Sequence, residues 1–300
     1  MNAPLPNGLQ ASLFGTRQRL HVQHGPTDLV IDADGVERLA LFEVAVDSMR
    51  DVLTGLADEL PSLRAPWQVD RVFSGPVARR MQDACALAGD RFVTPMAAVA
   101  GAIADHVLAA MMASRHATTA TKISVNNGGD LAFWTSNGAI TRAAIAGSLN
   151  AGITLRGSTG WRGMATSGQG GRSLSPGIAD SVTVLADCAA SADVVATLIA
   201  SAMDCPGVAG IDRIPANDID PNSDLGSRLV TVAVPPLDPS QIDTALSAGR
   251  KLATQLMAYR CIAGAVLELQ GKIAVVGLDD QAARLTTTRD PDGNSMTRED

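Results

Sequence analysis

Two oxygen-bearing side chains, Asp193 and Thr197, lie four residues apart in a segment rich in alanine and valine. In an α-helix this spacing puts a carboxylate and a hydroxyl on the same face. Oxygen ligands of these kinds suit Mg²⁺, which can in turn hold a phosphate group. A second interpretation stays open. An aspartate in a first helical turn complements the helix dipole, and a threonine hydroxyl can bond to a carbonyl of its own helix.

A stretch of small and hydroxyl-bearing residues precedes this segment. Met164–Gly168 is predicted to end a strand, and residues 169–177 to form a loop before the next strand. Small residues let backbone N–H groups approach a ligand closely. The hydroxyls of Thr166, Ser167 and Ser173 add hydrogen-bonding partners. We therefore expect a polar cradle for a small anionic ligand at this place in the chain.

Two further stretches combine small residues with polar ones. The sequence Asn-Gly-Gly-Asp at 127–130 predicts a turn after a strand, and its polar residues can be turn formers only. Residues 97–106 predict a helix that starts almost free of bulky side chains. A ligand could approach the N-terminal backbone of such a helix. Tight packing against a neighbouring sheet is the alternative, and the spacing alone favours it.

The composition indicates a globular protein for which nucleic acid is not the main partner. The 300 residues include 31 acidic and 24 basic side chains, a net charge of −7, without a basic cluster, and binding to nucleic acid needs clustered positive charge. Four widely spaced cysteines without a CxxC pair are typical of a reducing compartment. Neither a secretion signal nor an apolar run of the roughly 18 residues needed to span a membrane is evident. We expect a cytoplasmic protein that binds a small-molecule ligand and no membrane.

Hydrophobic periodicity and turn residues predict the elements that must position these side chains. Helices are predicted at 36–60, 74–89, 97–106, 189–203 and 239–259. Strands are predicted at 19–23, 27–33, 123–127, 131–135, 140–145, 152–156, 161–165, 178–185, 228–234, 262–269 and 272–276. This order predicts an α/β (α+β) fold with a central, mostly antiparallel sheet and helices packed on it.

The domain organisation predicted from the sequence is simple. A single domain covers residues 16–282, between a flexible N-terminus at 1–15 and a disordered tail at 283–300, which is polar and lacks periodicity. The abundance of small apolar residues favours a homodimer.

Several motifs in the same order resemble the ApbE-like proteins, an uncharacterised branch of the superfamily founded by the flavin transferase ApbE. The resemblance extends over nearly the whole chain. It rests on His24–Pro26, Thr94–Asp105, Asn127–Asp130, Ala165–Gly168, Gly171–Ser173, Gly177–Thr183 and Asp224–Thr231. The superfamily implies a tunnel-type fold around a central sheet, like the one predicted above.

The resemblance also implies ligands. The transferases bind FAD and Mg²⁺ and move FMN onto a threonine of a target protein. The metal site that they imply here consists of Asp193, Thr197 and a backbone carbonyl near Ala98. The residues implied or expected to line the cleft for FAD or FMN are Gly128, Gly129, Asp130, Thr166, Ser167, Gly168, Arg172 and Ser173, among which Arg172 adds positive charge.

Two departures from the transferase pattern shape the functional prediction. Ala100 stands where the transferases carry a lysine, and residues 170–176 replace a histidine-rich segment. We therefore expect metal and cofactor binding without flavinylation of proteins in the manner of the transferases.

Two functions are consistent with these residues. The first is a Mg²⁺-assisted cleft that binds a flavin nucleotide or small anionic metabolite, in a transferase- or hydrolase-type enzyme. The second is a non-catalytic binding or accessory protein in sulfur or ring-compound metabolism. Flavin-free catalysis by Ser173, Ser175 or Asp180 has little support, since no Ser–His–Asp order is recognisable.

Overall fold

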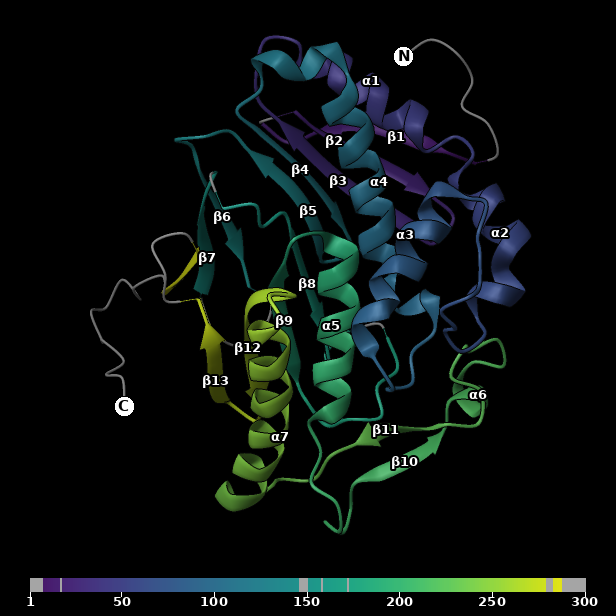
Figure 1. The fold of residues 1–300 in the computed structure, drawn as a ribbon, viewed down its shortest axis with the longest axis vertical. Helices are drawn as coiled ribbons and strands as arrows, with labels where there is room; N and C mark the ends of the chain where they lie inside the picture. The colour runs from purple at the N-terminus through teal and green to yellow at the C-terminus, as the bar shows by residue number, and fades with distance from the viewer. Residues whose placement is uncertain are drawn as a thin grey trace.

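An antiparallel sheet of nine strands forms the centre of the molecule (Figure 1). The structure, a computed structural model, describes residues 8–16, 18–145, 151–157, 159–171, 173–278 and 283–287. In spatial order the strands are β1 (Gln10–Phe14), β2 (Arg19–His24), β3 (Thr27–Ala33), β4 (Lys122–Asn127), β5 (Asp130–Thr135), β8 (Gly163–Ser167), β9 (Ser181–Ala186), β12 (Ile262–Leu269) and β13 (Lys272–Gly277). The predicted α/β class with a mostly antiparallel sheet is confirmed.

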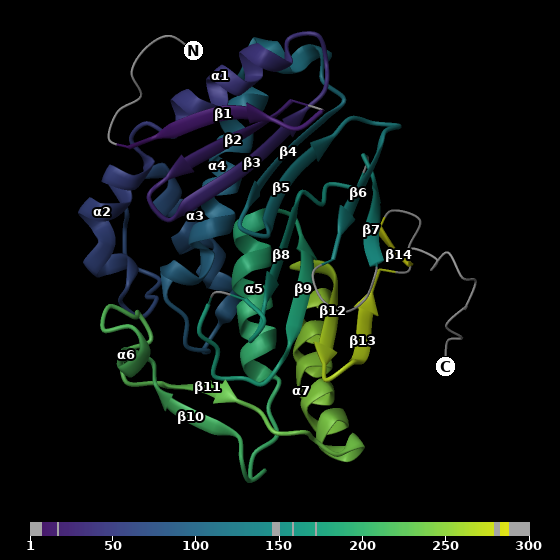
Figure 2. The ribbon, with the colours of Figure 1, turned by 180° about the vertical axis from the view of Figure 1, so that it is seen from behind.

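Helices cover one face of this sheet, and α1 (Arg38–Ser48), α4 (Val99–Ala113), α5 (Ala189–Ala202) and α7 (Pro239–Ala258) contact its strands. The other helices are α2 (Val52–Leu63), α3 (Pro76–Cys85) and α6 (Ala216–Ile219), with 3₁₀ turns η1 (Ala86–Ala88), η2 (Pro95–Ala98) and η3 (Arg115–Thr119). Figure 1 shows α4, α5 and α7 in front of the sheet, and Figure 2 shows the strands in front of these helices. The other face of the sheet therefore lacks this helical layer.

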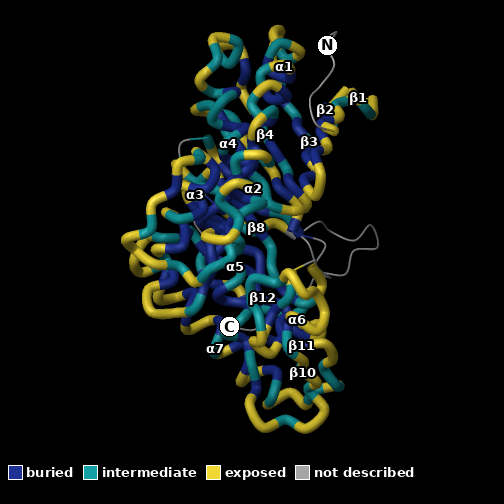
Figure 3. Tube along the Cα trace, turned by 90° about the vertical axis from the view of Figure 1, so that its right-hand side faces the viewer, coloured by how far each residue is buried: buried dark blue, intermediate teal, exposed yellow. Residues whose placement is uncertain are grey.

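Period-two alternation explains how the strands bury one face. In β3, Leu29 and Ile31 are fully buried, and the paired β2 buries Leu20 and Val22 on the same side. These side chains join the main core beneath the helices. Figure 3 shows buried segments concentrated where α4, α5 and β8 meet, with exposed segments mainly in the outer loops.

Two small sheets extend the central one. The first joins β6 (Ile140–Ala144), β7 (Ala151–Arg156) and β14 (Ala283–Thr287), and encloses a second apolar cluster that includes Phe133 and Ile153. The second pairs β10 (Asp212–Pro215) with β11 (Leu229–Ala233). Together with α6 it forms the lower part of the molecule in Figure 1.

The structure corrects several element boundaries. The helix predicted at 36–60 is interrupted between α1 and α2, and Pro61 lies inside α2 instead of ending it. At the chain ends, β1 falls within residues expected to be flexible, and β14 falls within the expected tail. In both cases pairing with a neighbouring strand supplies backbone hydrogen bonds, which local composition does not reveal.

One apolar helix is longer than expected. Within the described residues, Pro95–Ala113 is long and apolar enough by length and composition to span a membrane, which corrects the expectation that no apolar run reaches this length. Half of the apolar window is buried, and α4 contacts α1, α3, α5, β4 and β5. A core helix meets the same test, because core and bilayer both select apolar side chains. The cytoplasmic location and the homodimer stay predictions.

Candidate functional site

Helix α5 carries both side chains predicted to bind a metal. The N-terminus of α5 is hydrogen-bonded to a side chain of α4. Asp105 of α4 accepts hydrogen bonds from the backbone N–H groups of Ala189 at 3.0 Å and Ala190 at 2.9 Å. These two donors would otherwise be unsatisfied at the helix start. Burial raises the pKa of Asp105, although both N–H groups oppose the rise. The position of α5 against α4 is thereby determined, and with it the positions of Asp193 and Thr197.

Asp193 lies beside Asp130, the first residue of β5, and a side-chain hydrogen bond joins the two carboxyl groups. The backbone N–H of Gly101 also donates to Oδ2 of Asp193, at 3.2 Å. Burial, followed by the charge of Asp130, raises the pKa of Asp193 well above its ordinary value. Two carboxyl groups in contact are stable only when one of them binds a proton or when a cation compensates both charges.

Hydroxyl groups connect α5 to the end of β8. Oγ1 of Thr197 donates to Oγ of Ser167 at 3.5 Å. Oγ1 of Thr166 lies 2.7 Å from Oγ1 of Thr183 on the neighbouring strand β9. Thr197, Thr166 and Ser167 are half-buried, so each keeps some exposed surface. The predicted metal-binding helix and the predicted polar cradle therefore meet.

A cavity of about 840 Å³ opens beside the acidic pair. Its apolar wall includes Leu53, Leu56 and Leu60 of α2, and its polar wall includes both aspartates of the pair. This volume is within the range typical of small-molecule sites.

A second cavity of about 320 Å³ adjoins the first. Both are lined by Asp130, Asp193 and Ser173, and the smaller one is also lined by Thr197 and by Asp224 from the loop before β11. The acidic pair therefore faces two connected spaces.

The structure brings most predicted site residues to these cavities. The larger cavity is lined by Gly128, Asp130, Thr166, Ser167, Ser173 and Asp193. Arg172 lies outside the described residues. The grouping of the other residues agrees with the sequence-based site, while their roles stay predictions.

Three predicted residues line neither cavity, and their surroundings indicate structural roles. Gly129 has a φ of 121°, and its N–H donates to the side chain of Asn126, as in a tight turn. Gly168 has a φ of 135°, and a Cβ there would lie 2.6 Å from the carbonyl oxygen of Asp180. Ala98 is fully buried in η2. Its neighbours Ala97, Val99 and Ala100 line the cavities instead.

Several other residues that line the cavities are not among the predicted site residues. Asn127 donates from Nδ2 to the carbonyl oxygen of Ala100 at 3.1 Å and accepts from the N–H of Asp28 at 3.4 Å. It therefore ties the glycine turn to the start of α4. Arg64, just after α2, is the basic residue among the described lining of both cavities. No local pattern distinguishes it from a surface arginine.

The flavin-free alternative gains no support from the geometry. The hydroxyl oxygen of Ser175 is buried and accepts a hydrogen bond from the N–H of Gly177 at 3.2 Å. Asp180 accepts a hydrogen bond from the N–H of Gln270. Among the described residues that line the two cavities there is no histidine to activate Ser173. These residues do not form a nucleophile with its base.

The comparison with protein families confirms the resemblance seen in the motifs. Residues 11–275 match the family described as AbpE bacteria. The chain belongs to this ApbE-like family. A curated relative, the UPF0280 protein of Methanothermobacter thermautotrophicus strain Delta H, is 38% identical over 143 residues. That match covers 45% of this ApbE-like protein and 52% of the relative, so it spans about half the length of each.

Two solved structures are also similar to this ApbE-like protein. The ApbE protein of Thermotoga maritima is 11% identical, with a TM-score of 0.46, and the match covers 89% of this chain and 96% of the other. The apo flavinyl transferase ApbE of Pseudomonas stutzeri is 15% identical, with a TM-score of 0.41, and the match covers 89% and 93%.

Proposed function

We propose that this ApbE-like protein binds a flavin nucleotide, FAD or FMN, together with Mg²⁺ in the 840 Å³ cavity, as a transferase- or hydrolase-type enzyme. The observation that carries the proposal is the contact between Asp130 and Asp193 at the wall of this cavity. A pair of half-buried acids in contact is costly to keep, and binding a cation relieves their repulsion.

The donor set fits a small, hard cation. Mg²⁺ prefers oxygen ligands, usually one or two carboxylates completed by water and substrate phosphates. Asp193 and Thr197 supply a carboxylate and a hydroxyl, and Asp130 supplies a second carboxylate. No group of three or more His, Cys, Asp or Glu residues suited to a metal occurs among the described residues. With two carboxylates and one hydroxyl from the protein, the proposed site leaves room for water and phosphate oxygens. The carbonyl near Ala98 is its remaining proposed ligand.

The two walls of the cavity serve different parts of a nucleotide. The hydroxyls of Thr166, Ser167 and Ser173 donate to phosphate oxygens, and Arg64 adds positive charge. The leucines of α2 offer an apolar surface to the flavin ring. When bound, Mg²⁺ neutralises the phosphates and polarises a reacting oxygen.

Calorimetry with FAD and with FMN, each in the presence and absence of Mg²⁺, tests this proposal. We expect Mg²⁺ to strengthen flavin binding by about tenfold or more, which corresponds to about 1.4 kcal/mol. Asp193→Asn keeps the side-chain shape and should abolish this gain. Asp58→Asn, an exposed aspartate on α2, should retain it. Flavin binding by the wild type that is absent or indifferent to Mg²⁺ would contradict the proposal.

A non-catalytic binding protein is the second candidate, and one observation favours it. Neither lysine nor histidine occurs among the described residues that line the two cavities, so general acid–base groups of these types are not at hand. Chromatography of FAD incubated with the protein and Mg²⁺ distinguishes the candidates. Release of FMN and AMP from FAD supports a hydrolase. Tight binding of FAD without turnover, also when candidate acceptor proteins are present, supports an accessory role.

A further inference from the structure

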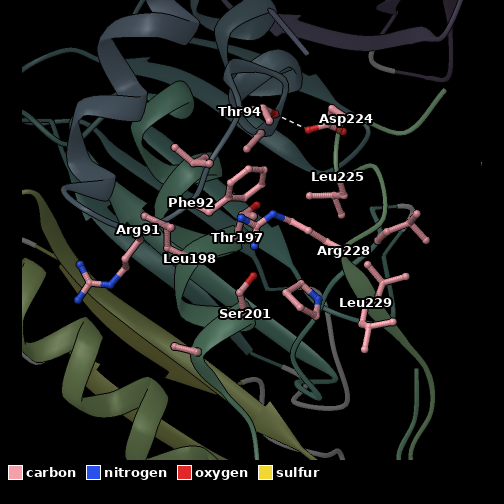
Figure 4. Close-up of a pocket in the computed structure, with 16 residues that line it drawn as sticks. Arg91, Phe92, Thr94, Thr197, Leu198, Ser201, Asp224, Leu225, Arg228 and Leu229 are labelled. Carbon is pink, nitrogen blue, oxygen red and sulfur yellow. Dashed lines mark hydrogen bonds between the residues drawn. The ribbon is translucent and has the colours of Figure 1, made fainter. Parts of the chain in front are cut away.

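A third cavity, of about 480 Å³, lies between η2, α5 and the segment that leads into β11 (Figure 4). Thr197 lines this cavity as well as the 320 Å³ cavity of the acidic pair. The two spaces therefore meet at Thr197. The function proposed above uses no residue that is specific to this third cavity.

The side chain of Arg228 lies at the centre of the third cavity. Figure 4 shows Arg228 reaching across it to the ring of Phe92, and Cζ of Arg228 lies 3.4 Å from the ring centroid. Among the described residues, neither a salt bridge nor a side-chain hydrogen bond engages this guanidinium. Its planar group is held by stacking and keeps its N–H donors available.

Within the described part of the chain, no salt bridge joins Arg228 to a carboxylate. Asp224 accepts a hydrogen bond from Oγ1 of Thr94. Arg91 points away from the centre in Figure 4 and donates to the carbonyl oxygen of Ala88 at 3.4 Å. Among the described lining residues, Arg228 is therefore the positive group at the centre of the cavity, and the carboxylate of Asp224 lies at its side.

The remaining surface of the cavity is mainly apolar. Leu198 of α5, Leu225 and Leu229 lie around Phe92 and Arg228, and the hydroxyl of Ser201 points toward the same space (Figure 4). An apolar surface around one fixed cation and one hydroxyl is suited to a ligand with an apolar body and an anionic head.

We propose that this cavity binds a small amphipathic anion, with its oxyanion on Arg228 and Ser201 and its apolar body against Phe92 and the leucines. Arginine binds carboxylate and phosphate heads alike through paired N–H donors. Because Thr197 faces both spaces, the anion lies next to the acidic pair and serves as a second substrate. The role as a substrate rests on the proposed function, whereas binding of the anion does not.

Titration calorimetry without Mg²⁺ or flavin tests the site, with benzoate, phenyl phosphate and uncharged benzyl alcohol as probes. We expect at least one anion to bind about tenfold or more tightly than benzyl alcohol, and the better anion identifies the head group as carboxylate or phosphate. Arg228→Ala should lose at least tenfold in affinity for that anion. Arg228→Lys should lose less, because it keeps the charge but not the planar fork.

A matched control separates this site from general electrostatics. Arg250→Ala removes an exposed arginine of α7 that lines none of the described cavities, and it should leave binding unchanged. Equal binding of benzoate, phenyl phosphate and benzyl alcohol would overturn the proposal, as would anion binding that Arg228→Ala does not weaken. Since these titrations use neither Mg²⁺ nor flavin, their outcome is independent of the flavin experiment.

Discussion

Three aspartates of this protein differ in how far hydrogen bonds compensate the effect of burial on their carboxyl groups. Asp34 is half-buried and accepts hydrogen bonds from Thr121 and Lys122, which outweigh the effect of desolvation and lower its pKa. Asp105 is buried with two backbone donors, and burial still raises its pKa. Asp193 has one backbone donor and faces a second carboxyl group. The protein itself supplies least compensation to Asp193, which is the expected property of a residue that binds an external cation.

The first prediction concerns the stability cost of the acidic pair. Asp193→Asn should raise the free energy of unfolding at neutral pH, without Mg²⁺, by roughly 1–2 kcal/mol, because the raised pKa of Asp193 costs stability at that pH and a neutral amide carries no such cost. Thermal unfolding in a chelating buffer measures this change. Asp58→Asn should leave the unfolding temperature unaltered. A marked loss of stability in Asp193→Asn would show that the charged pair holds the fold together.

Asp34 gives a second prediction, which concerns how its contribution to stability depends on pH. Its folded pKa is lowered below the ordinary 3.8, so the stabilisation it provides is present above that value and is lost as pH falls through the folded pKa. Asp34→Asn should lower the free energy of unfolding by about 1–2 kcal/mol at neutral pH, through lost hydrogen bonds to Thr121 and Lys122. Urea unfolding at neutral pH and near pH 3 should show this difference shrinking in acid.

A suitable control for Asp34 lies in the same half of the chain. Asp51 precedes α2 and its side chain makes no capping hydrogen bond. Asp51→Asn should therefore change stability little at either pH. If the difference in unfolding free energy between Asp34→Asn and the wild type stayed the same in acid, it would contradict the lowered pKa of Asp34.

At the scale of elements, the site depends on close approach between α4, α5 and β8. A Cβ on Gly101 of α4 would lie 2.3 Å from the carbonyl oxygen of Ala189. A Cβ on Gly163 of β8 would lie 1.9 Å from the carbonyl carbon of Cys188. Both glycines touch the start of α5, so they set the depth at which Asp193 enters the cavity. Gly101 of α4 thus serves helix packing, whereas Ala97 of η2 and Ala100 of α4 line the cavities.

The third prediction compares the same substitution in two helices. Gly101→Ala should destabilise the protein by about 1–3 kcal/mol, because the added methyl group overlaps with the backbone of α5. Gly55→Ala in α2, where an added Cβ meets nothing within 4 Å, should stabilise it by up to about 1 kcal/mol through helix propensity. Urea unfolding of both variants measures the contrast. Equal effects of the two would contradict close packing at Gly101.

At the scale of the whole molecule, one large core extends under the sheet and shields the thiols. Cys85 and Cys188 are held in low-dielectric surroundings, and burial, with nearby aspartates, raises the pKa of each to about 12. Burial also raises the pKa of Cys261, a half-buried residue between α7 and β12. Few thiolates are therefore present at neutral pH in the folded protein.

The fourth prediction uses these thiols to report on global opening. Near pH 8, iodoacetamide should label the half-buried Cys261 first and the half-buried Cys188 more slowly, because the pKa of Cys188 is raised to about 12. It should label Cys85, which is fully buried, only as fast as the protein unfolds. Mass spectrometry of peptides after timed labelling measures the order. Prompt labelling of Cys85 would contradict its closed packing in the core. A urea series provides the control, since all rates should converge in the unfolded protein.

Local patterns in the sequence predicted much of this protein. Alternation in residues 27–33 identified β3, the four-residue spacing placed Asp193 and Thr197 on one helical face, and the glycine turn at 127–130 was located correctly. Such features depend on residues close in the chain, for which backbone geometry dictates which side chains share a face.

Only the tertiary structure decided which of these faces meet. Asp130 and Asp193 come from separate elements, and no local pattern indicates their contact. The same holds for Arg228 stacked on Phe92. The pairing of β14 with β7 likewise depends on a partner distant in the chain. Local sequence determines the orientation of a side chain within its own element, whereas the packing of the whole core determines which elements stand opposite one another.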